Sequence, residues 1–405
     1  MSFPISACAA ICSHWWQIFE PQSEWHAASL PALPESTDTA HPIERPVMDR
    51  VRQYAISLLE ADNSHYPSSH HTSSSSSQFY SAIMTSGTLS DKVSALTLVV
   101  QESPVHNMKA MESLLSLARK RSRGQAIDVL KALKDLMAQG AVLPPHRKLR
   151  SFMQQPALIE ALHASNMDWK QGQPLPGLIQ EVHLVYWAYE DWLKTFYFEL
   201  LKVLETWCND GVEFARARAI AYVWELLKDK PEQESNLLRL LVNKLGDREK
   251  KIASKVSFLL LQLENVHPKM KSTIISAIES ELLFRPGQHS HARYYAVITL
   301  NQTVLSVKEG GVAAKLLEIY FSVFVSLLKR PEETKPASTG PNAVKLNRKG
   351  EVQGGGGPVG KHSRRKDTFK QTSQELDENS REKMISAVLT GVNRAIPFAT
   401  TDSET

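Results

Sequence analysis

The chain contains few cysteines and few glycines, and each shortage narrows the choice of fold class. Only three of its 405 residues are cysteine, an odd number without a C-x-x-C motif, which argues against a disulfide framework and is typical of a reducing compartment. Cys8, Cys12 and His14 lie close together, but no second ligand pair stands at zinc-finger spacing, so no metal site is predicted. The 18 glycines and the scarcity of alternating apolar and polar residues argue against a β protein.

Targeting and membrane-spanning segments are also missing from the sequence pattern. Residues 1–16 have no Lys or Arg before a short, polar-interrupted apolar run, unlike a secretory signal peptide. No segment reaches the roughly 18 consecutive apolar residues that a membrane span needs. Since 42% of the residues are apolar, most of the chain can still bury a core. The sequence therefore predicts a soluble, intracellular protein without a membrane partner.

Catalytic and cofactor motifs are absent as well. The sequence has no nucleophile elbow, no H-E-x-x-H and no Cys/His pair in a supportive context. Residues 355–362 resemble a phosphate-binding loop, but His362 stands where Ser or Thr would hold magnesium, and polar linker flanks both sides. We therefore expect no enzymatic activity, no cofactor and no small-molecule substrate.

Helical periodicity dominates residues 88–330, where apolar side chains recur in short segments separated by Pro, Gly and Asp turns. Ser90 is the expected cap of the first helix. The longest helix is expected at about 178–208, with its many aromatic side chains mostly in the core. Short helices in succession, as in 245–263 and 267–286, are typical of two-helix repeats. This predicts an all-α fold, a HEAT/armadillo-like α-solenoid of stacked helical hairpins.

The flanking segments have a different composition. Residues 1–87 are predicted to be mostly irregular, with one short helix at 47–61 and a low-complexity linker at 65–77. Residues 331–376 are polar, basic and Gly-rich, and are predicted to be a disordered linker. A helix is expected again at 381–398, within a final segment of residues 377–405.

Basic residues are concentrated at two of the predicted helix ends. Between residues 105 and 155 there are ten Lys/Arg and three Asp/Glu, whereas the whole chain has a net charge of only +4. These basic residues form a turn cluster (Arg119, Lys120, Arg121 and Arg123) and a loop cluster (Arg147, Lys148 and Arg150). Complementing a helix dipole would need fewer charges. We expect both clusters to contact RNA phosphates or an acidic partner, without sequence-specific readout, because no RNA-recognition motif or zinc finger accompanies them.

A third basic group, the linker cluster, lies in residues 331–376. Its members are Arg348, Lys349, Lys361, Arg364, Arg365 and Lys366. One interpretation is a solvated run of charge. Exposed basic clusters in unfolded segments also serve as nuclear import signals or diffuse RNA contacts, and this interpretation is favoured here because the segment has no fold to stabilise.

Several long segments resemble one known family. They are TLSDKVSALTLVVQESPVHNMKAMESLLSLARKRSRGQAIDVLKALKDL (88–136), residues 245–263 and 267–286, RYYAVITLNQTVLS (293–306) and LTGVNRAIPF (389–398). In this order they resemble the CCAAT/enhancer-binding protein zeta family, called maintenance-of-killer protein 21 in fungi, over about residues 25–398. Members of that family continue well beyond the last segment, so residues 377–405 are expected to open a truncated CCAAT-binding-factor domain.

The resemblance implies a non-enzymatic scaffold of the nucleus and nucleolus. Its expected role is early biogenesis of the large (60S) ribosomal subunit, including rRNA processing. The expected partners are pre-ribosomal RNA, pre-60S particles and a second nucleolar-complex protein. One alternative is a transcriptional coactivator at CCAAT promoters, although no helix or ribbon suited to reading a DNA groove is visible. A further alternative is a transport adaptor of importin type, which shares the solenoid architecture.

Overall fold

The computed structural model describes residues 17–34, 45–70, 75–120, 122–139, 142–164, 169–328 and 362–399, without the side chains of 67–80 and 362–377. Every regular element in these residues is a helix and none is a strand, so the predicted all-α class is confirmed. Tertiary contacts divide the chain into two compact units, Met1–Leu241 and Val242–Thr405. Each unit is described below by itself.

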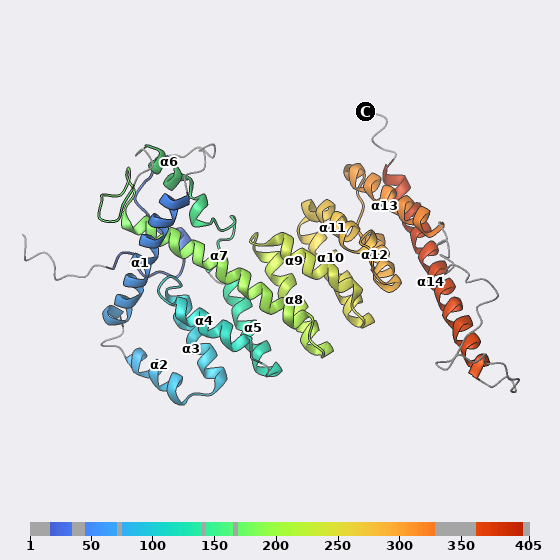
Figure 1. Ribbon diagram of the computed structural model, residues 1–405, viewed down its shortest axis with the longest axis horizontal. Helices are drawn as coiled ribbons and strands as arrows, with labels where there is room; N and C mark the ends of the chain where they lie inside the picture. The colour runs from blue at the N-terminus through green and yellow to red at the C-terminus, as the bar shows by residue number, and fades with distance from the viewer. Residues whose placement is uncertain are drawn as a thin grey trace, which may run out of the picture. The chain divides into compact units, whose positions relative to one another are not determined.

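Unit 1 is built from helices of very different lengths. They are α1 (Arg45–His70), α2 (Ser75–Ser86), α3 (Leu89–Glu102), α4 (Met108–Ala118), α5 (Arg123–Ala138), α6 (Pro156–Ala164), α7 (Glu181–Cys208), α8 (Glu213–Asp229) and the start of α9 (Glu234–Asn243). Helix α4 contacts both α3 and α5, α5 contacts α8, and α8 contacts α7 (Figure 1). The single-turn helices η1 (Trp25–Ala27) and η2 (Phe152–Gln154) lie in connections of unit 1. The single-turn helix η3 (Lys244–Gly246) follows α9 in unit 2.

Helix α7 lies close to the predicted 178–208 and is buried on more than one side. Trp187, Tyr189 and Tyr197 are core residues, as the sequence predicted for most of the aromatic run. Phe198 is different, because 41% of its surface is exposed. Apolar residues on several faces let α7 contact α1, α4 and α8 at once.

The start of α3 corrects the expected cap. The N-cap is Thr88 and not Ser90: the Thr88 hydroxyl accepts a hydrogen bond from the Asp91 amide, and the Asp91 carboxylate accepts one from the Thr88 amide. This reciprocal arrangement satisfies two amides that the helix itself cannot pair. Sequence reasoning missed it because Asp replaces the usual Glu or Gln at the third helical position.

The N-terminal region is more ordered than predicted. Helix α1 extends over 26 residues, beyond the expected 47–61, and α2 follows it, so much of the proposed linker 65–77 is helical. Trp25 is fully buried, and its indole N–H donates to the Val142 carbonyl at 2.7 Å. Asp62 of α1 accepts the amides of Ile18 and Phe19. Residues 17–34 are therefore held in unit 1 by distant partners that local composition does not reveal.

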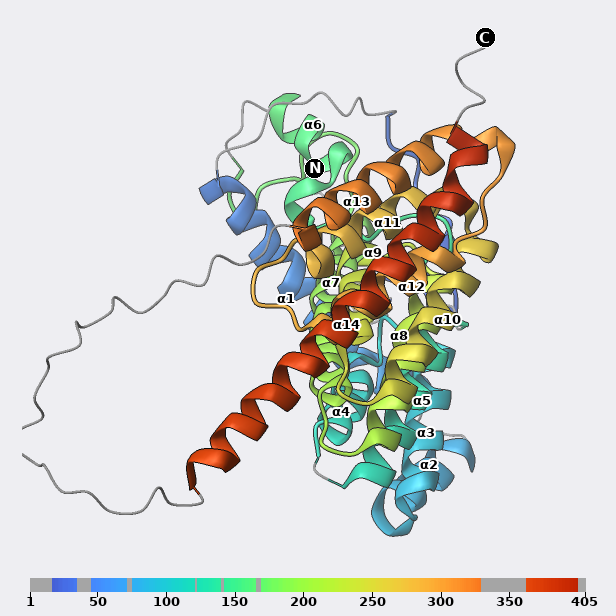
Figure 2. The same ribbon diagram turned by 90° about the vertical axis from the view of Figure 1, so that its right-hand side faces the viewer.

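Unit 2 consists of shorter helices followed by two long ones. They are α10 (Lys250–Val266), η4 (Pro268–Met270), α11 (Lys271–Ile278), the π-helical turn η5 (Glu279–Leu283), α12 (Ser290–Gln302), η6 (Val307–Glu309), α13 (Gly310–Leu328) and α14 (His362–Ala399). Helix α14 contacts both α12 and α13 (Figure 2). Two hydrogen bonds of 2.8 Å hold α14 there. The side-chain amide of Asn301 donates to the Ala387 carbonyl, and the Arg394 guanidinium donates to the Thr303 carbonyl.

Two expectations for this unit need correction. Helix α14 begins at His362, so residues 362–376 of the proposed disordered linker are helical. The stretch Val307–Leu328 is, by length and composition, long and apolar enough to cross a membrane, although no such stretch was expected. Its most apolar window is 28% buried, and Leu316, Ile319 and Tyr320 are among the buried residues of α13.

Gly391 sets how closely α14 approaches its neighbours. A Cβ at this position would clash with the Asn301 side-chain oxygen and with the Tyr320 ring. We expect Gly391→Ala to lower the free energy of unfolding by about 1–3 kcal/mol, the usual cost of overpacking a core, as measured by denaturant titration. Gly311→Ala on α13 is the control, because nothing lies within 4 Å of its Cβ position. Equal stability of the two variants would contradict the close approach.

Candidate functional site

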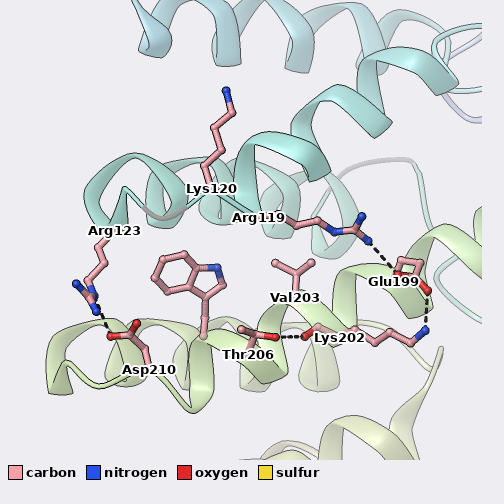
Figure 3. A pocket seen from close by; sticks show the side chains of 9 residues that line it. Arg119, Lys120, Arg123, Glu199, Lys202, Val203, Thr206 and Asp210 are labelled. Atoms are coloured by element: carbon pink, nitrogen blue, oxygen red, sulfur yellow. Dashed lines mark hydrogen bonds and ion pairs between the residues drawn. The ribbon is translucent and has the colours of Figure 1, made fainter.

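The turn cluster lies between α4 and α5 and faces the C-terminal half of α7 (Figure 3). Arg119 is the C-cap residue that follows α4, and Arg123 is the first residue of α5. Arg119 therefore complements the dipole of α4, whereas the charge of Arg123 at a helix N-terminus opposes the dipole of α5. The position of Arg123 favours a binding role over a capping role for this residue.

Two ion pairs tie the turn cluster to α7 and to the residues just after it. The Arg119 guanidinium lies 2.9 Å from the Glu199 carboxylate, and the Arg123 guanidinium lies 3.0 Å from that of Asp210. A hydrogen bond from Lys202 lowers the pKa of Glu199, and one from Arg123 lowers the pKa of Asp210. Both carboxylates are therefore charged at neutral pH and oppose part of the basic charge.

Between the turn and α7 lies an open pocket of about 670 Å³. Its lining consists of Arg119, Lys120, Arg123, Glu199, Lys202, Val203, Thr206, Trp207 and Asp210. The α7 members recur at intervals of three and four, so they share one face of that helix. Four cations against two carboxylates leave a surplus of two positive charges, which suits an anionic ligand.

Lys120 contributes charge without a partner in the described part of the chain. Its side chain is exposed and points away from α7 (Figure 3). The guanidinium groups of Arg119 and Arg123 are about half exposed, so their ion pairs contribute little to stability and can exchange for a phosphate. Arg121, the fourth predicted member, lies outside the described residues.

The loop cluster is used differently, because Arg147 is held by a buried carboxylate. Glu190 of α7 is 1% exposed and pairs with the Arg147 guanidinium. Burial acts to lower the pKa of Arg147, but the hydrogen bond and ion pair with Glu190 outweigh burial, and the pKa is raised. Glu190 also accepts the Arg150 amide at 3.0 Å and the Gln155 side chain at 2.9 Å.

Further contacts fix the rest of the same loop. Lys148 pairs with Glu234 at 2.9 Å, and the Leu149 amide donates to the buried Glu232 at 2.6 Å. The Arg150 side chain is exposed and makes no ion pair within the described residues. Of the three predicted residues, Arg147 thus anchors the loop, Arg150 keeps its charge open to a partner, and the exposed pair of Lys148 with Glu234 can exchange for another anion.

The two clusters contact different sides of α7. Glu190 binds Arg147 and Glu199 binds Arg119. The two glutamates are nine residues apart, which is about two and a half helical turns, so they lie on opposite sides of α7. The turn cluster with its pocket is therefore the more complete binding site, and the loop cluster does not extend it along one face.

The linker cluster is only partly described. Arg348, Lys349 and Lys361 lie outside the described residues, while Arg364, Arg365 and Lys366 lie near the start of α14. Cys8, Cys12 and His14 also lie outside the described residues. Within the described part, no group of His, Cys, Asp or Glu is arranged to hold a metal ion.

Comparisons with known proteins identify relatives over nearly the whole chain, although no family model matches it. Ribosome biogenesis protein NOC1 of Chaetomium thermophilum is 51% identical over 390 residues, which are 96% of this chain and 36% of the relative. CCAAT/enhancer-binding protein zeta of Mus musculus is 33% identical over 87% of this chain and 28% of its own length. Nucleolar complex protein 1 of Drosophila melanogaster is 34% identical over 60% and 20%. The chain belongs to the NOC1 family.

The family resemblance inferred from the sequence is thus confirmed. The chain spans only about a third of the length of the NOC1 relative, 36%. What the whole NOC1-family proteins bind is therefore considered below as a proposal.

Sequence reasoning missed the α7 half of the site in this NOC1-family chain. Glu199, Lys202 and Asp210 shape the pocket, yet only the aromatic residues of α7 attracted attention in the sequence. The signal was the spacing 199, 202 and 206, three polar residues on one face of the helix, with Asp210 just beyond its end.

Proposed function

We propose that this chain is a non-enzymatic part of a nucleolar scaffold for biogenesis of the large (60S) ribosomal subunit, and that it binds pre-ribosomal RNA. The names of its relatives refer to ribosome biogenesis and to a nucleolar complex, which supports the coarse role and a nuclear, nucleolar location. The pocket of the turn cluster supports the RNA contact. The expected protein partner is a second nucleolar-complex protein.

The observation that carries the RNA contact is a surplus of exposed cations at one turn. Arg119, Lys120, Arg123 and Lys202 line the pocket from the turn and from α7, and they outnumber its carboxylates by two. Cations on a rigid helical frame bind phosphates without reading bases, as binding to a large folded RNA requires. In this proposal the helical hairpins of each unit are HEAT/armadillo-like repeats whose turns present the charge.

A charge-removal variant tests this proposal. Changing Arg119, Lys120, Arg121 and Arg123 to Ser is expected to weaken binding of the full chain to hairpin RNAs of unrelated sequence. The slope of log affinity against log salt should become shallower by about 0.7–0.9 for each phosphate that the variant no longer binds. Fluorescence anisotropy over a series of KCl concentrations measures both quantities. Unchanged affinity and slope would contradict the proposal.

A second variant removes negative charge from the pocket and is expected to have the opposite effect on RNA binding. Glu199→Gln with Asp210→Asn keeps the side-chain shapes but removes the two charges that occupy Arg119 and Arg123. Tighter RNA binding with a steeper salt slope is expected, because the freed cations then face phosphate. Thermal unfolding serves as the control for folding, since the ion pairs removed are exposed.

CCAAT-promoter binding, the function named for one relative, is tested with the same protein. A duplex DNA containing CCAAT and a duplex of scrambled sequence are compared as competitors of the labelled RNA. Equal competition by the two duplexes agrees with backbone binding, and a clear preference for CCAAT would favour the coactivator role over the scaffold.

A further inference from the structure

Two exposed phenylalanines lie close in sequence to residues that line the pocket of the turn cluster, and each has a cation over its ring. The Lys202 ammonium lies 4.8 Å from the centre of the Phe198 ring, and the Arg218 guanidinium lies 5.3 Å from that of Phe214. Phe198 is 41% exposed and Phe214 is 59% exposed. Both rings therefore present part of their surface to solvent, with a cation held over each.

Phe198 belongs to the pocket through Lys202. The same lysine lines the pocket, hydrogen-bonds to Glu199 at 2.7 Å and covers the Phe198 ring. The two positions are four residues apart on α7, so they are neighbours on the helix surface. A ligand that replaces Glu199 at Lys202 therefore also meets the Phe198 ring.

Phe214 is joined to the opposite end of the pocket through Asp210. The Asp210 carboxylate accepts the Val212 amide at 2.7 Å, and Arg216 donates to the Asp210 carbonyl at 2.9 Å. These bonds hold the first turn of α8 beside the residue that pairs with Arg123. Phe214 is the second residue of α8 and therefore lies in this first helical turn.

The part of α7 that follows Phe198 is long enough for a short stretch of nucleic acid. From Phe198 to the end of α7 at Cys208 there are ten residues, or about 15 Å along the helix axis. A nucleic-acid strand advances about 3.4 Å per stacked nucleotide, so this length of helix matches about four stacked nucleotides. Their phosphates would face the cations of the turn cluster.

We propose that this surface binds single-stranded RNA, with unpaired bases stacking on Phe198 and Phe214 and phosphates held by Arg119, Lys120 and Arg123. This inference rests on the proposed RNA-binding function and specifies its ligand. Aromatic rings stack on any base, and cations above the rings add attraction, so binding is tolerant of sequence. Duplex RNA keeps its bases stacked inside and offers the rings no such contact.

The test replaces each ring by an aliphatic side chain. Phe198→Leu and Phe214→Leu are each expected to lower the affinity of the full chain for a single-stranded RNA about 5- to 150-fold, the range for one stacked base. Affinity for a duplex RNA with the same number of phosphates should stay unchanged, as should the salt slope. The unaltered chain should quench the fluorescence of a 2-aminopurine base in the single strand by stacking, and the leucine variants should not.

Matched controls separate stacking from other effects. Phe198→Tyr keeps a ring and should retain binding. Phe258→Leu on α10 removes a ring that is 55% exposed but is not in cation–π contact with any described residue, and should change nothing. Equal losses for duplex and single strand, or no loss in either leucine variant, would overturn the stacking proposal while RNA binding itself stands. Absence of RNA binding by the unaltered chain would overturn both proposals.

Discussion

Replacing Glu190 by alanine is expected to lower the free energy of unfolding by about 2–4 kcal/mol, somewhat less than the cost of breaking a fully buried ion pair because the Arg147 side chain is 38% exposed. The Glu190 carboxylate accepts hydrogen bonds from the Arg147 guanidinium, the Arg150 amide and the Gln155 side chain. Its removal leaves a half-buried cation and two further donors without this acceptor. Denaturant titration of the full chain measures the effect.

Glu199 provides the matched control, since it lies on the same helix and also binds an arginine. Its carboxylate is partly exposed, and Glu199→Ala is expected to change stability by less than about 1 kcal/mol. Similar losses for the two alanine variants would show that Glu190 does not hold the loop. A Glu190→Gln variant keeps the shape and an acceptor but not the charge, and is expected to fall between them.

The second large effect is a dependence of stability on pH that originates at Glu264. This residue of α10 is 2% exposed, and burial raises its pKa to about 7 from the ordinary value of 4.5. A hydrogen bond from Thr303 and the positive charges of Lys271 and Arg394 oppose that rise without cancelling it. One carboxylate oxygen has no hydrogen-bond partner among the described residues, as a protonated group would tolerate better than a charged one.

A raised folded-state pKa makes the protein more stable at low pH. Between about pH 4.5 and 7 the folded chain retains a proton that the unfolded chain has released. The contribution is therefore complete below pH 4.5 and is lost as the pH rises through 7. The loss amounts to at most about 3 kcal/mol, at roughly 1.4 kcal/mol per pKa unit.

Comparison with a variant isolates this contribution from other titrations. Glu264→Gln cannot titrate, so its stability difference from the unaltered chain should change in its favour by up to about 3 kcal/mol between about pH 4.5 and 8. Glu318→Gln replaces an exposed carboxylate of α13 and should show no such trend. A constant difference for Glu264→Gln across that range would contradict a buried, protonated carboxyl.

The local sequence determined those helices in which apolar residues recur at every turn. In α4, Met111, Leu114 and Leu115 occupy one apolar stripe, and burial of this stripe follows from spacing alone. The same reasoning located α7 and the all-α class. It underestimated α1, because polar residues interrupt its apolar pattern although Val51, Ala55 and Leu59 are buried in the core.

Part of the candidate site was likewise predictable from the sequence, and part was decided only by the tertiary structure. Composition located the turn cluster, because an excess of charge is visible without coordinates. The partners of that cluster are 80 residues away for Arg119 and 87 for Arg123, a separation that only folding bridges. Tertiary structure also decided that Arg147 anchors a loop, because its distant partner Glu190 is buried beside it. Local spacing thus fixed the helices and the charge, whereas long-range contacts decided which charges remain open for a ligand.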